Sequence, residues 1–123
     1  MTAEATTIHR PAGIHLLADL HGIEASLLTD AERIDALLRE AALAAGARIL
    51  HSHFHTFGPG MGITGVLLLA ESHISIHTWP EVGFAAADIF MCGAARPQLA
   101  LDVIDQALAP GAREVKIVER GQL

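Results

Sequence analysis

Apolar and polar residues follow two repeating patterns along the chain. In residues 30–47 and 96–109 apolar positions recur every three to four residues, which predicts two helices. Asp30 or Thr29 can cap the first of these helices, Gly46 fits its C-terminal end, and Pro97 suits the first turn of the second. Alternating or continuous apolar residues predict strands in the remaining stretches, at 13–22, 48–57, 63–72, 73–79, 83–92 and 113–120.

The order of these elements predicts the fold class. A strand, a helix and a strand occur near each end of the chain, and short turns join the strands between them. Such halves can pack both helices on one face of a largely antiparallel sheet, which is a two-layer α/β sandwich of the α+β class. We expect one domain over residues 1–123, with the polar residues 1–11 as a flexible lead-in.

The composition indicates a second copy of the chain as a partner. Hydrophobic residues make up 51% of the sequence, and mean hydropathy is +0.39. A chain of this size buries only about two thirds of its unfolded surface on folding. We therefore expect part of the apolar surplus to cover an interface in a homodimer.

Charge and cysteine content exclude several classes of protein. The net charge is −6 and no basic cluster is present, so a nucleic-acid partner is not expected. The longest aliphatic run, residues 66–70, is far shorter than the roughly 20 residues of a membrane span. The first residues lack the pattern of a signal peptide, and the single cysteine, Cys92, allows no intrachain disulfide. These features predict a cytoplasmic protein.

Histidines at alternate positions suggest one possible site. His51, His53 and His55 would lie on one face of a strand, where they could bind a transition metal, and His73 and His77 could join them. Alternating histidines are also ordinary on a half-exposed strand. No arrangement of histidines and carboxylates matches the spacing of a known metalloenzyme, so we expect no metal.

The stretch "AESHISIHTWPE", from Ala70 to Glu81, carries the other candidate residues. A hydrolase that used Ser72 would need the G-x-S-x-G turn, and "AESHI" has neither glycine. Strict alternation also places Ser72 and His77 on opposite faces of a strand. We expect a bulge or turn near Ser72 to bring the two together. Cys92, taken alone, is typical of a small buried apolar residue.

Taken together, these motifs resemble the prokaryotic S-adenosylmethionine decarboxylases. The similarity rests on "ESHISIHTWPE" with Cys92 in "IFMCG" twenty residues after the serine, and it extends to "GIHLLADL", "FHTF" and "TGVLLLAES". It covers roughly residues 13–120. The resemblance implies a lyase that is made as a zymogen and serves polyamine (spermidine) biosynthesis.

The resemblance implies autocatalytic cleavage between Glu71 and Ser72. The Ser72 hydroxyl would attack the Glu71 carbonyl, and the resulting ester would be eliminated and hydrolysed to leave a pyruvoyl group on the residue that was Ser72. That cofactor would form a Schiff base with the substrate amine and accept the electrons released with carbon dioxide. The active form would then be a homodimer of cleaved protomers.

The resemblance also assigns roles to individual residues. His77 matches the base of chain cleavage, and Cys92 matches the acid that returns a proton to the substrate. Thr64 stands where the family usually has a serine that assists cleavage, and it keeps the hydroxyl. Phe57 would stack on the adenine of S-adenosylmethionine, and Glu81 would bind its ribose hydroxyls.

Two alternatives follow from the same residues. Some members of the family use L-ornithine or L-arginine in place of S-adenosylmethionine, and they keep the pyruvoyl group. From another class, a non-enzymatic dimer could bind metal through His51, His53 and His55 and would leave Ser72 uncut.

Overall fold

The computed structural model describes residues 11–121, which contain six strands and two α-helices. The strands are β1 (Gly13–His21), β2 (Ile49–Thr56), β3 (Ile63–Leu69), β4 (Ser72–Trp79), β5 (Phe84–Cys92) and β6 (Ala112–Arg120). The α-helices are α2 (Ala31–Ala44) and α3 (Pro97–Leu108). Short 3-10 helices, η1 (Ala25–Leu28) and η2 (Pro80–Val82), lie in two of the connections. None of the described helices is long and apolar enough to cross a bilayer.

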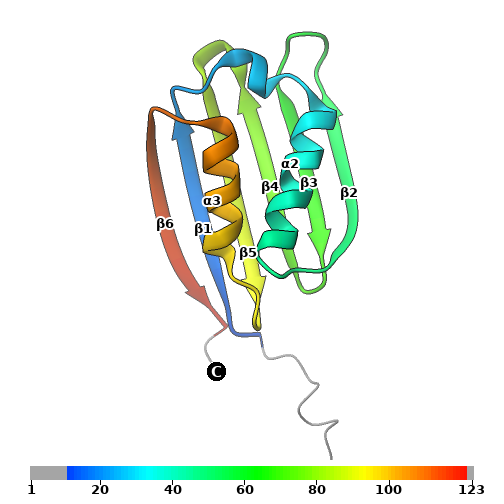
Figure 1. Cartoon of the computed structure of the whole chain (residues 1–123), viewed down its shortest axis with the longest axis vertical. Coiled ribbons are helices and arrows are strands. Elements are labelled where there is room, and N and C mark those ends of the chain that lie inside the picture. The colour runs from blue at the N-terminus through cyan, green and yellow to red at the C-terminus, as the bar shows by residue number, and fades with distance from the viewer. Residues whose placement is uncertain (1–10, 122–123) are drawn as a thin grey trace, which may run out of the picture.

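The strands of the described chain form one sheet in the order β2-β3-β4-β5-β1-β6, and every neighbouring pair is antiparallel. Both α-helices lie on the same face of this sheet (Figure 1). The predicted α+β fold with two layers is therefore confirmed. The expected lead-in, apart from Pro11, lies outside the described residues.

Alternation along the strands separates a covered face from a bare one. On the central strands every second residue is buried under the helices, as the pattern of β5 shows at Ala85, Ala87, Ile89 and Met91. Apolar residues of α2 and α3 complete this core. The residues between them point to the other face of the sheet, which no described element covers (Figure 1).

The predicted helix ends are confirmed. The Asp30 side chain accepts a hydrogen bond of 3.2 Å from the Arg33 N–H and caps α2. Gly46 follows α2 with a φ of 83°, and Pro97 occupies the first turn of α3. The sequence pattern did not reveal the two 3-10 helices, because each is a single turn without a repeating apolar face.

One buried hydroxyl joins the loops at one end of the sheet. Thr78, on β4, is 5% exposed, and its Oγ1 accepts a hydrogen bond from the Ile63 N–H and donates one to the Leu28 carbonyl, both at 2.8 Å. These bonds tie β3 and η1 to β4. They fix the start of β3, which lies next to the candidate residue Thr64.

Replacing this hydroxyl should destabilise the fold. Thr78→Val keeps the shape but leaves a buried N–H and a buried carbonyl without partners, which should cost about 2–4 kcal/mol of unfolding free energy. Thr78→Ser keeps the hydroxyl and should cost about 1 kcal/mol or less. Equilibrium unfolding in urea at matched protein concentration measures both values. A valine variant as stable as the serine variant would contradict this account.

Candidate active site

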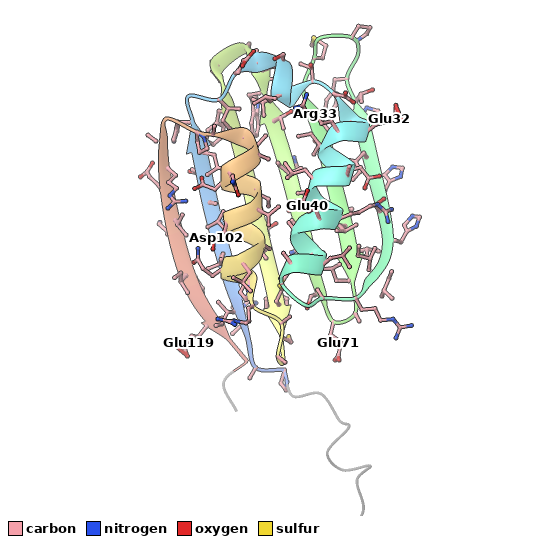
Figure 2. The ribbon with its side chains drawn as sticks, in the orientation of Figure 1. Glu32, Arg33, Glu40, Glu71, Asp102 and Glu119 are labelled. Carbon is pink, nitrogen blue, oxygen red and sulfur yellow. The ribbon has the colours of Figure 1, made fainter. Side chains whose placement is uncertain are left out.

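The candidate residues fall into two groups at opposite ends of β4. Ser72 opens the strand, directly after the two-residue connection of Ala70 and Glu71 that joins β3 to β4. Figure 2 places Glu71 at the tip of this hairpin, at the lower end of the sheet. Cys92 is the last residue of the neighbouring strand β5 and lies at the same end of the sheet. This set, Glu71, Ser72 and Cys92, is called the cleavage group below.

The cleavage group is held by backbone contacts. The Ser72 Oγ accepts a hydrogen bond of 3.3 Å from the Cys92 N–H, which fixes the hydroxyl against the end of β5. Glu71 has a φ of 59°, in the left-handed region that residues with a Cβ rarely adopt. A surface cavity of about 320 Å³ lies over the group, with Arg48 on its wall.

The surroundings of Cys92 favour the protonated form of its thiol. Burial raises the pKa of the Cys92 thiol, and the Glu71 carboxylate raises the pKa further, because a negative charge nearby disfavours a thiolate. The Cys92 thiol therefore keeps its proton at neutral pH. This fits the acid role that the resemblance assigns to Cys92.

The second group lies at the other end of β4. Thr64 and His77 are cross-strand partners, and the Thr64 Oγ1 lies 3.1 Å from the His77 Nδ1. Phe57 and Glu81 line the same surface cavity, of about 280 Å³, as Thr64 and His77. The structure thus brings together four residues that the sequence resemblance had assigned to cleavage and substrate binding. This set, Phe57, Thr64, His77 and Glu81, is called the binding group.

The two groups cannot meet within one chain. β4 pairs with β3 without a register shift from Ser72 to His77. Five residues of strand separate their Cα atoms by about 16 Å. The expected bulge or turn that would bring Ser72 to His77 is therefore wrong. The turn at Ala70 and Glu71 precedes Ser72 and does not shorten the path to His77.

The histidines also differ from the sequence interpretation. His51, His53 and His55 lie on the exposed side of the edge strand β2, and no three-residue metal cluster of the described chain includes them. The described cluster whose ligand atoms lie within 4.8 Å of one another consists of His15, His73 and Asp88. The sequence pattern missed it because His15 and Asp88 are neighbours only through the pairing of β1 with β5.

Hydrogen bonds define this second cluster. His15 Nε2 lies 2.8 Å and His73 Nε2 lies 3.4 Å from Asp88 Oδ2, and Ser75 donates to Asp88 Oδ1. Burial alone would raise the pKa of Asp88, but the bonds from Ser75, His15 and His73 outweigh burial and hold that pKa below its ordinary value.

Arg120 determines which ring nitrogen of His15 carries the proton. Its Nη1 lies 3.3 Å from the His15 Nδ1, and a guanidinium can only donate. The His15 Nδ1 therefore accepts, and its Nε2–H donates to Asp88. A metal ion at this place would have to displace that proton, so the contacts favour a hydrogen-bond network over a metal site.

Comparison with known proteins gives a consistent result. Residues 14–121 match the family model described as S-adenosylmethionine decarboxylase. The chain is 45% identical over 115 residues to an S-adenosylmethionine decarboxylase proenzyme of Sulfurihydrogenibium, covering 93% of this chain and 86% of that protein. It is 43% identical over 110 residues to the proenzyme of that name from Methanococcus maripaludis, covering 89% of each.

A solved structure also matches. The crystal structure of the adenosylmethionine decarboxylase from Aquifex aeolicus superposes with a TM-score of 0.85 at 40% sequence identity. The match covers 93% of this chain and 94% of the other.

The environment of Cys92 predicts a shifted titration. In a Ser72→Ala chain, which keeps the peptide bond intact, alkylation of the single thiol by iodoacetamide should have a higher pH midpoint in the folded chain than in the same chain unfolded in urea. Glu71→Gln should lower this midpoint, because it removes the negative charge that opposes the thiolate. Glu40→Gln, on α2, should leave the midpoint unchanged (Figure 2). An unchanged midpoint in Glu71→Gln would show that the carboxylate does not act on the thiol.

Proposed function

The chain belongs to the S-adenosylmethionine decarboxylase family, and on that premise we propose that Ser72 becomes its pyruvoyl group and that a second copy of the chain completes each active site. The observation that carries this proposal is the division of the candidate residues. The nucleophile and the proton donor lie at one end of β4, and the base and the binding residues lie at the other.

The residues of the cleavage group fit the chemistry of chain cleavage. The Ser72 Oγ attacks the carbonyl carbon of Glu71, so that an ester replaces the peptide bond. A base then removes the Ser72 α-proton, and the Cβ–Oγ bond breaks. The Oγ departs as part of the α-carboxylate of Glu71, which is the new C-terminus of the first fragment. Water replaces the nitrogen of the resulting dehydroalanine, and the nitrogen departs as ammonia. A pyruvoyl group at this position supplies a ketone that accepts the electrons released in decarboxylation.

The bare face of the sheet supports the pairing of two copies. Apolar side chains on this face are partly exposed: Leu17 (39%), Leu68 (46%), Trp79 (42%) and Val118 (40%). Such an apolar face is typical of one that packs against another layer. A twofold axis that lies between two facing sheets, perpendicular to the strands, reverses the strand direction. It sets the Ser72 end of one β4 against the His77 end of the other.

In this arrangement each residue has a defined role. His77 of one copy removes the Ser72 α-proton of the other copy, and the Thr64 hydroxyl, 3.1 Å from its Nδ1, orients the ring. Cys92, on the same copy as Ser72, returns a proton to the substrate carbon after carbon dioxide leaves. Phe57 and Glu81 of the copy that provides His77 bind the substrate.

The chemistry of the binding cavity favours S-adenosylmethionine. Phe57 is 59% exposed in the single chain and offers a ring face for stacking. The Glu81 carboxylate can accept hydrogen bonds from ribose hydroxyls, and its charge complements a sulfonium. The cationic side chain of L-ornithine or L-arginine could also pair with Glu81, but neither substrate has a purine to stack on Phe57 or ribose hydroxyls to donate to Glu81.

Mixing two inactive variants tests the shared site. Ser72→Ala should not cleave, and His77→Ala alone should stall at an ester that hydroxylamine cuts. When the two variants are co-expressed with different tags, about half of the His77→Ala chains should be cleaved into residues 1–71 and 72–123, because random pairing supplies half of them with a partner that has an intact His77. Mass spectrometry of the tagged chains measures this fraction.

The matched control supplies no intact base. Co-expression of His77→Ala with the double variant Ser72→Ala/His77→Ala should produce no cleavage. If the His77→Ala chain is also left whole beside Ser72→Ala, the base acts within its own chain and the shared site is refuted. A wild-type chain that stays intact after folding would refute self-cleavage itself.

Loss of the stacking ring should weaken substrate use selectively. Stacking of a base on an aromatic side chain contributes about 1–3 kcal/mol in nucleic-acid binders, so Phe57→Ala should lower kcat/KM for S-adenosylmethionine roughly ten- to a hundredfold. Leu43→Ala, which removes an exposed apolar side chain from α2, should leave kcat/KM within about twofold of the wild type. Carbon dioxide release measures the rates. Wild-type turnover of ornithine or arginine in preference to S-adenosylmethionine would overturn the substrate assignment.

A further inference from the structure

The backbone of Glu71 is unusual for its residue type. Among the described residues other than glycine, only Glu71 and Ala109 have a positive φ, at 59° and 46°. The other positive values all belong to glycines, which adopt this region without a steric cost. A residue with a Cβ pays for this conformation, because its Cβ approaches the following carbonyl oxygen. The turn before Ser72 therefore holds a glutamate in a conformation that the described chain, apart from Ala109, reserves for glycine.

The surrounding contacts keep Glu71 in this conformation. The connection between β3 and β4 has only two residues, and it is closed by the pairing of Leu69 with Ser72. The Ala70 N–H donates a hydrogen bond of 2.9 Å to the Arg48 carbonyl. On the other side, the Cys92 N–H holds the Ser72 Oγ at 3.3 Å. Strain of this kind persists where neighbouring structure leaves the residue no alternative.

We propose that the left-handed backbone of Glu71 is a positioning device that strains the Glu71–Ser72 linkage and promotes its conversion to an ester. This inference rests on the proposed self-cleavage. It assigns the effect to the backbone of Glu71 and not to its carboxylate.

The first step of cleavage releases this strain. The bond from Ser72 Oγ to the Glu71 carbonyl carbon forms, the bond from that carbon to the Ser72 nitrogen breaks, and the hydroxyl proton ends on the freed amine. No other reactant is required. In the peptide, one atom, the Ser72 nitrogen, links the Glu71 carbonyl carbon to the Ser72 Cα. In the ester, two atoms, Oγ and Cβ, link them. The turn thereby gains one atom, which lets Glu71 leave the left-handed region.

Two variants that both lack the carboxylate isolate the backbone effect. Glu71→Ala keeps the Cβ and its steric cost, whereas Glu71→Gly removes the cost. Glu71→Gly should therefore form cleaved chains about three- to tenfold more slowly than Glu71→Ala. The chains are labelled during cell-free translation, and labelling is then stopped. The fraction of cleaved chains is measured over time and gives the two rates.

Ala109 provides the matched control. Ala109→Gly makes the same change at the other left-handed residue, which ends α3 and is not part of either site group. This variant should cleave at the wild-type rate. A second readout uses the uncleavable Ser72→Ala background, where Glu71→Gly should melt at a higher temperature than Glu71→Ala because it relieves the strain without cleavage.

The outcomes separate this inference from the proposed function. If the wild-type chain cleaves but Glu71→Gly cleaves as fast as Glu71→Ala or faster, the strain has no role in cleavage and the inference is overturned. The same holds if Glu71→Gly does not raise the melting temperature in the Ser72→Ala background. If the wild-type chain itself never cleaves, the proposed function fails first.

Discussion

The unbroken pairing of β4 between β3 and β5 is the constraint on which the rest of the structure depends. Hydrogen bonds on both sides hold this strand in one register from its first residues to Trp79. A central strand of this kind cannot bend to bring its two ends together. Its two ends therefore hold separate sets of candidate residues, with Ser72 and Cys92 at one end and His77 with the other residues of the binding group at the opposite end. A site that needs both sets must draw them from two chains.

The one-sided cover of helices gives the second constraint. α2 and α3 bury the side chains of one face, so alternation sends the remaining side chains of β4 and β5 to the bare face (Figure 1). Ser75, His77 and Asp88 lie there because each occupies a position between two buried ones, and His73 follows the same alternation. On β4 and β5 the apolar core therefore depends on one set of alternate residues, and Ser75, His77, Asp88 and Cys92 belong to the other; Ser72 shares the alternation of the core residues but lies at the start of its strand.

Local features of this molecule could be predicted from the sequence, whereas contacts that depend on strand order could not. The Asp30 cap and Pro97 follow from short-range rules and were found correctly. Alternation also placed Ser72 and His77 on opposite faces, but the inferred bulge assumed that one chain must form the whole site. The contact of His15 with Asp88 joins residues 73 positions apart, and only the insertion of β1 next to β5 creates it. The left-handed Glu71 gave no signal, since turn rules at such a position favour glycine or asparagine.

The network around Asp88 shows how a face that carries charge can still be covered. A carboxylate removed from water costs stability unless hydrogen bonds replace its solvation. Asp88 receives these bonds within its own chain, from Ser75, His15 and His73. The same bonds keep its pKa below the ordinary range despite burial. Because the carboxylate is already satisfied, a second sheet can pack over it without supplying a partner. The proposed pairing of two bare faces therefore needs only apolar contacts at this place, and the polar residues at both ends of β4 remain available for the reaction.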